Sequence, residues 1–70
     1  MEKFLGVSGK PVKVKLVGRD GNAFAILGAC MSAARTSLVD PIKIKAFKDE
    51  ATSGDYNHLL VTCMDCFDVN

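Results

Sequence analysis

The sequence has little of the material that catalytic, metal or secreted proteins use: its 70 residues include one histidine, three cysteines and no tryptophan. An odd number of cysteines and a first segment without the apolar core of a signal sequence argue against a secreted disulfide scaffold. No stretch approaches the roughly 18 uninterrupted apolar residues of a membrane span. These absences predict a protein of the reducing cytoplasm with no membrane partner.

Charge of one sign is also not in excess, because nine basic and eight acidic residues leave a net charge of +1. That balance gives no argument for a polyanionic partner. The charges are nevertheless split along the chain. Residues 1–35 carry six basic and two acidic side chains, a net of +4, and residues 36–70 carry three basic and six acidic ones, a net of −3. Such a split would help two copies dock head to tail, or fold one half onto the other.

The length allows one domain, and the composition, 49% apolar and 24% charged, is that of a globular protein. A chain this short has marginal stability unless a metal, a disulfide or a partner subunit supports it. We predict an α+β fold, with a short N-terminal strand or hairpin followed by three helices in a small single domain. Residues 1–11 are a weakly patterned leader or a first strand, and residues 12–70 form the domain.

Residues 12–17 are the clearest strand, because apolar and basic residues alternate there with the period of two that a half-buried strand requires. The apolar face consists of Val12, Val14 and Leu16, and the basic face of Lys13 and Lys15. A strand cannot stand alone. Its partner is residues 4–7, residues 67–69 or a second molecule.

Three helices are predicted over residues 23–34, 41–51 and 56–66, with residues 35–39 as a loop. Each begins after a side chain that can cap it: Asn22 or Asp20, then Asp40, then Asp55. Pro41 occupies the first position of the second helix, where proline is favoured. Gly54 is predicted to end that helix in a left-handed conformation.

The three helices have apolar faces at helical spacing, which are predicted to form the core. In the first helix this face is Phe24, Leu27, Met31 and Ala34; in the second, Ile44, Phe47 and Ala51; in the third, Tyr56, Leu59, Leu60, Cys63 and Phe67.

The first helix is unusual because no charged residue occurs from Asn22 through Ala34. Its other side is small and nearly apolar, and a helix of this kind is usually buried on several sides. In so short a chain, either this is the central helix or its small side meets a partner. We therefore predict an interaction surface made of Ala25, Gly28, Ala29, Ser32 and Ala33, together with Lys13 and Lys15 of the strand.

Cys63 and Cys66 form a Cys-x-x-Cys pair, which is typical of half a zinc site or of a redox site. The pair lies at the end of a predicted helix, whereas a redox pair should open one. A zinc site would also need Cys30 and His58, and His58 is on a different face of the helix from Cys63. We predict that Cys63 is a small core residue and that no metal or cofactor is bound.

His58 is also the one candidate for acid–base chemistry. Nearby in the sequence are two acidic residues and two hydroxyl residues: Glu50, Asp55, Thr52 and Ser53. Spacing alone does not place a nucleophile against a base. The alternative, which we favour, is that Asp55 caps the third helix and His58 lies exposed on its first turns. The protein is therefore not expected to be an enzyme.

Two blocks of the sequence resemble a group of short uncharacterised proteins of bacteria and their phages. They contain Gly18-Arg19-Asp20-Gly21-Asn22-Ala23-Phe24 and Glu50-Ala51-Thr52-Ser53-Gly54-Asp55-Tyr56. The resemblance covers residues 12–69. Residues 29–32 depart from it, because the group has basic residues after the Ile-Leu-Gly that residues 26–28 form, where this chain has Ala-Cys-Met-Ser. The resemblance implies a compact domain and no particular activity.

The function predicted from the sequence is a small protein–protein interaction or accessory module that associates with itself. Its partner is a second copy of the chain or another protein. The alternative is a nucleic-acid-associated regulator, for which the warrant is the basic N-terminal half and the face made by Lys13 and Lys15. The helix over residues 56–66 carries no lysine or arginine, so it would make a poor recognition helix.

Overall fold

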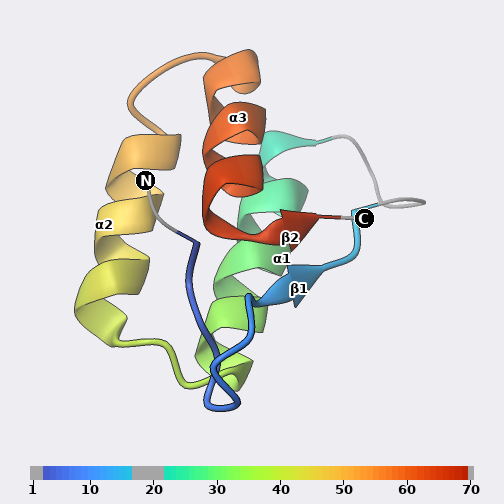
Figure 1. Cartoon of the computed structure of the whole chain (residues 1–70). Coiled ribbons are helices and arrows are strands. Elements are labelled where there is room, and N and C mark those ends of the chain that lie inside the picture. The colour runs from blue at the N-terminus through green and yellow to red at the C-terminus, as the bar shows by residue number, and fades with distance from the viewer. Residues whose placement is uncertain (1–2, 17–21, 70) are drawn as a thin grey trace.

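The computed structural model describes residues 3–16 and 22–69 of the chain. Within them the elements follow the order β1 (Lys13–Val14), α1 (Ala23–Thr36), α2 (Pro41–Ala51), α3 (Tyr56–Cys66) and β2 (Asp68–Val69). The predicted α+β fold, a short N-terminal strand followed by three helices, is confirmed (Figure 1). None of the helices in the described ranges is long and apolar enough to cross a membrane.

The three helix starts are where the capping residues predicted them. Each cap accepts a hydrogen bond from a backbone amide of the first turn: Asn22 from Phe24 at 2.8 Å, Asp40 from Ile42 at 2.9 Å, and Asp55 from His58 at 2.9 Å. Such a bond contributes about 0.5–2 kcal/mol, because the first amides of a helix have no partner within it. The other candidate cap, Asp20, lies outside the described residues.

The end of α1 differs from the prediction, because the helix continues through Arg35 and Thr36. It closes in a Schellman arrangement. The amide of Val39 donates to the carbonyl of Ala34, and the amide of Leu38 donates to that of Arg35, both at 3.0 Å. This arrangement requires a left-handed residue after the helix. Leu38 has that conformation, with φ 62°.

The predicted left-handed stop at Gly54 is wrong. The helix α2 ends at Ala51, and Thr52 caps it with φ −97°. The Thr52 hydroxyl donates to the Lys48 carbonyl at 2.8 Å, so the last turn is closed by a side chain. Gly54 is needed for space instead, because a Cβ added there would lie 2.9 Å from both Cβ and Cγ of His58.

The strand β1 is shorter than the predicted residues 12–17, and Val17 lies outside the described residues. It pairs in parallel with β2, Lys13 opposite Asp68 and Val14 opposite Val69. An antiparallel bridge joins Leu5 to Pro11 on the preceding segment. Two of the three possible partners, the N-terminal and the C-terminal segments of the same chain, therefore supply the pairing (Figure 1).

The segment over residues 3–11 packs against the end of α3. The Phe4 amide donates to the Cys66 carbonyl at 2.8 Å, and the Phe4 side chain is buried. Lys3 Nζ donates to the carbonyls of Met64 and Phe67 at 2.7 and 3.0 Å. A cation at this position complements the negative end of the helix dipole.

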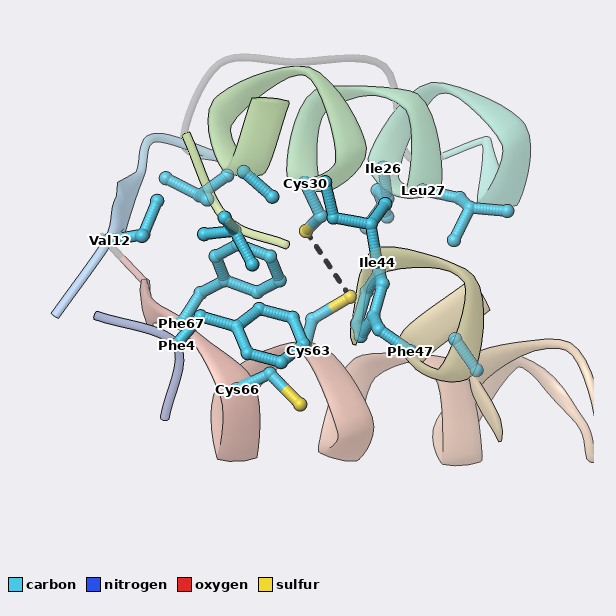
Figure 2. Packing of buried hydrophobic residues seen from close by; sticks show 14 of the residues in the cluster. Phe4, Val12, Ile26, Leu27, Cys30, Ile44, Phe47, Cys63, Cys66 and Phe67 are labelled. Atoms are coloured by element: carbon cyan, nitrogen blue, oxygen red, sulfur yellow. Dashed lines mark hydrogen bonds between the residues drawn. The ribbon is translucent and has the colours of Figure 1, made fainter. Parts of the chain in front are cut away.

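The core lies where the three helices meet the strands, and three phenylalanines form its centre (Figure 2). Phe4, Phe47 and Phe67 pack edge to face, with ring centroids 5.2–5.9 Å apart. Such pairs contribute about 0.5–1.5 kcal/mol beyond the area they bury. Most of the predicted core is confirmed as buried: Leu27, Ala34, Ile44, Phe47, Ala51, Leu59, Cys63 and Phe67.

Two aromatic residues predicted for the core are on the surface. Phe24 is 83% exposed and Tyr56 is 43% exposed. Each lies in the first turn of its helix. Thr62 is buried instead, and its hydroxyl donates to the His58 carbonyl at 2.8 Å, which removes the cost of burying it.

Candidate functional site

A hollow of about 540 Å³ lies between α1 and β1, and we call it the α1–β1 hollow. Six of the seven residues predicted as an interaction surface line it: Lys13, Lys15, Gly28, Ala29, Ser32 and Ala33. Val14, Thr36 and Ser37 complete the lining. The seventh predicted residue, Ala25, is exposed on α1 but does not line this hollow.

The hollow exists because one side of α1 carries almost no side-chain volume. Gly28 and Ser32 are four residues apart, as are Ala29 and Ala33, so the four lie on neighbouring turns of one face. A Cβ added at Gly28 would meet nothing within 4 Å. Gly28 and Ser32 are exposed, whereas Ala29 and Ala33 are partly buried against the core.

The α1–β1 hollow is basic and contains hydroxyl groups. Lys13 and Lys15 are exposed, and no carboxylate is among the residues that line the hollow. Ser32, Thr36 and Ser37 add hydroxyls. The surface is therefore suited to close approach of another backbone or to an anionic group.

A second hollow, of about 640 Å³, lies between α1 and α2, and we call it the α1–α2 groove. Its lining is apolar in the middle and basic at the edges: Met31, Arg35, Leu38, Val39, Pro41, Ile44, Lys45 and Lys48. Sequence reasoning missed it, because the groove depends on how two helices cross and on the conformation of residues 37–39. The signal that the sequence did contain was a leucine two residues after the helix end, in a segment predicted to be a loop.

The two exposed aromatic residues line a third hollow, of about 320 Å³, where the start of α1 meets the end of α2 and the start of α3. Phe24 and Tyr56 are on its edge, and Leu27 and Leu59 are buried beneath it. No lysine or arginine lines it. The charge pattern that distinguishes the other two hollows is therefore missing here.

The structure brings His58 together with Glu50 and Ser53. His58 Nε2 lies 2.8 Å from Glu50 Oε2, 3.0 Å from the Glu50 carbonyl and 3.4 Å from Ser53 Oγ. The hydrogen bond between the two side chains raises the pKa of His58 and lowers the pKa of Glu50. Of the other two neighbours, Thr52 closes α2 and Asp55 caps α3.

This cluster does not have the geometry of a nucleophile and its base. The Ser53 hydroxyl donates to Glu50, to its carbonyl at 2.7 Å and its carboxylate at 3.1 Å. A catalytic relay places the hydroxyl and the carboxylate on opposite imidazole nitrogens, whereas here both face Nε2 of His58. The arrangement holds the α2–α3 connection in place.

The three cysteines are fully buried and none is in a disulfide. Cys30 Sγ donates a hydrogen bond to Cys63 Sγ, which raises the pKa of Cys30 and lowers that of Cys63. Burial raises the pKa of Cys66. His58, the other residue that zinc would need, is held at the surface by Glu50. In the described part of the chain, no three histidine, cysteine or acidic side chains are placed to hold a metal ion.

Comparison with known proteins adds no name to these surfaces: no family model, curated protein or solved structure matches the chain. The α1–β1 hollow and the α1–α2 groove are the two candidate sites, since both combine exposed basic side chains with a lining that contains no carboxylate.

Proposed function

We propose that the protein is a non-catalytic protein–protein interaction module that associates with a second copy of itself through the α1–β1 hollow. The observation that carries this proposal is that Gly28, Ala29, Ser32 and Ala33 line one hollow with open space above Gly28. Small residues let a second helix backbone approach closely, since the distance between packed helices depends on the side chains at the contact.

A twofold dimer is the arrangement that this surface supports best. The same patch on each copy then meets itself, and the assembly closes at two subunits. A partner would also add stability to a chain whose small core gives little in reserve. No charged residue precedes Arg35 in α1, so burying this face of the helix in a dimer removes no charge of α1 from water.

The lysines at the edge give the dimer a distinctive response to salt. Two copies bring Lys13 twice to one interface that contains no carboxylate in its lining. Added salt screens this repulsion, so the dimer should become tighter as the ionic strength rises. Head-to-tail association through the +4 and −3 halves would weaken under the same change.

The proposal is tested by filling the hollow. Ser32→Gln puts a long neutral side chain into it, and Ala46→Gln makes a similar change on the exposed surface of α2, outside the hollow. We expect Ser32→Gln to weaken self-association by at least about tenfold in sedimentation equilibrium, and Ala46→Gln to leave it as in the parent. Equal association of Ser32→Gln and the parent would overturn the proposal.

The second candidate is a nucleic-acid-associated regulator, and Lys13 and Lys15 beside a hollow without carboxylates are the observation in its favour. Such binding loses affinity steeply with salt, the opposite of the response expected for the dimer. If neither labelled double-stranded nor labelled single-stranded nucleic acid binds the protein at low salt, this candidate function is ruled out. In either case we place the protein in the reducing cytoplasm, where its three thiols stay reduced.

A further inference from the structure

The left-handed conformation of Leu38 closes α1, but this position in the fold does not explain why the residue is leucine. Its φ of 62° is in the left-handed region, where a side chain is strained and glycine is usual. The hydrogen bond from its amide to Arg35 needs only the backbone, so glycine would make it equally well. The side chain gains little from burial, because it is 74% exposed. A strained residue with no role in packing points to a contact outside the chain.

The surroundings of Leu38 define what that contact is made of. Val39 and Ile44, which are buried, form the apolar floor of the α1–α2 groove, and Met31 and Pro41 add to its apolar lining. Three cations form its edge: Arg35, Lys45 and Lys48. Among the described residues no carboxylate lies within ion-pair distance of these three cations, and the ion pair that is present joins His58 to Glu50.

We propose that the α1–α2 groove binds a short amphipathic helix of a partner protein, with carboxylates beside its apolar stripe. The apolar stripe contacts Leu38 and the floor, and the carboxylates pair with the cations at the edge. Charge complementarity selects this partner, because the groove offers three cations and no acid. This site is separate from the α1–β1 hollow, and neither proposal depends on the other.

The dimensions of the groove favour a helix of about two turns. Pro41 and Lys48 both line it and lie on one helix, so at a rise of about 1.5 Å per residue the groove extends for about 10 Å along α2. A partner helix covers that length with apolar residues at i, i+3 or i+4, and i+7. No aromatic side chain lines the groove, so it offers nothing on which nucleic-acid bases would stack.

The test is an NMR titration of the whole chain with two synthetic peptides of about 12 residues. Both carry the same leucine stripe at helical spacing, with glutamates beside the stripe in one peptide and lysines in the other. We expect saturable shifts of the Met31, Leu38 and Ile44 methyl signals with the glutamate peptide, and none with the lysine peptide. No shifts at millimolar peptide, equal shifts with both peptides, or shifts confined to the α1–β1 hollow would overturn the proposal.

Two matched variants separate binding from folding. Leu38→Gly relieves the backbone strain, so it should remain folded and lose at least about tenfold in affinity for the glutamate peptide. Val7→Gly removes another exposed side chain, 78% exposed and outside the groove, and should bind as the parent does. Unchanged affinity of Leu38→Gly would overturn the proposal. So would loss of self-association in that variant without peptide, which would assign the groove to a second copy. Ser32→Gln should bind the peptide normally even if the dimer proposal fails.

Discussion

Cys30 and Cys63 lie 33 residues apart in the sequence, yet their sulfur atoms are 3.4 Å apart at the contact between α1 and α3 (Figure 2). Both side chains are fully buried. Cys30 donates the hydrogen bond between them and Cys63 accepts it, so the pKa of Cys30 is raised and the pKa of Cys63 is lowered. This contact joins the helix with the small exposed side to the helix that carries the Cys-x-x-Cys pair, so the pair is part of the core.

The burial of all three thiols predicts that they do not react in the folded protein. Cys30 and Cys66 have raised pKa values, and Cys63, whose pKa is lowered, has no access to solvent. Alkylation by iodoacetamide, followed by mass spectrometry, should therefore proceed at the rate at which the chain opens, and urea should accelerate all three sites together. Rapid labelling of any one thiol in the native protein would contradict this core.

Phe47 and Phe24 make a matched pair for testing the core, because one is fully buried and the other is 83% exposed. Phe47→Ala removes a ring that contacts both Phe4 and Phe67 and should cost about 3–5 kcal/mol of unfolding free energy. In a domain of this size that loss is enough to unfold the chain. Phe24→Ala should change stability by less than about 0.5 kcal/mol. Urea denaturation of both variants checks this, and similar losses for the two would refute the packing.

His58 and Glu50 predict a stability term that depends on pH. Because the pKa of His58 is raised in the folded protein, its contribution to stability is fully present below the ordinary pKa of 6.5. That contribution is lost as the pH rises through the raised pKa of the folded state. Because the pKa of Glu50 is lowered in the folded protein, its contribution to stability is fully present above the ordinary pKa of 4.5. That contribution is lost as the pH falls through the lowered pKa of the folded state. The pair is therefore fully effective between these two ordinary values.

His58→Gln removes this pH-dependent term. The difference in urea midpoint between the parent and His58→Gln should be larger near about pH 5.5 than near about pH 9. Asn57→Gln, on the neighbouring exposed position, is the control and should follow the parent at both pH values. If the difference for His58→Gln grows toward high pH, the ion pair is not what stabilises this connection.

Leu38 predicts a stabilising substitution. The left-handed conformation costs a residue with a Cβ about 1–2 kcal/mol, whereas glycine adopts it freely. Glycine also gives the unfolded chain more freedom, which offsets part of that gain. We expect Leu38→Gly to raise the unfolding free energy by up to about 1 kcal/mol, measured by urea denaturation. A loss of stability would mean that the Leu38 side chain supports the fold, and the reason for assigning it to a partner would disappear.

Much of the fold could be predicted from local signals. Asn22, Asp40 and Asp55 each cap a helix because the bond they accept lies within three residues of sequence. The small side of α1 and the alternating lysines of the predicted strand over residues 12–17 likewise predicted most of the residues that line one hollow, since each pattern depends only on the period of its own element.

What could not be predicted depends on how the elements meet. Phe24 is exposed although it is at helical spacing from buried Leu27, because its burial depends on how α1 packs against the other helices, and no helical wheel contains that information. Gly54 looked like a helix stop, but its role is to leave room for His58, four residues later on the next helix. The α1–α2 groove needs the crossing of two helices and the left-handed Leu38, and the sequence of either helix alone does not specify them.

The measurement that tests the central claim most directly is sedimentation equilibrium of the reduced parent protein at about 0.1 M and about 0.5 M salt. Self-association through the α1–β1 hollow predicts a monomer–dimer equilibrium that shifts toward the dimer at the higher salt concentration, because Lys13 of one copy meets Lys13 of the other there. A monomer at every concentration up to about 1 mM, or an association that weakens with salt, would contradict it.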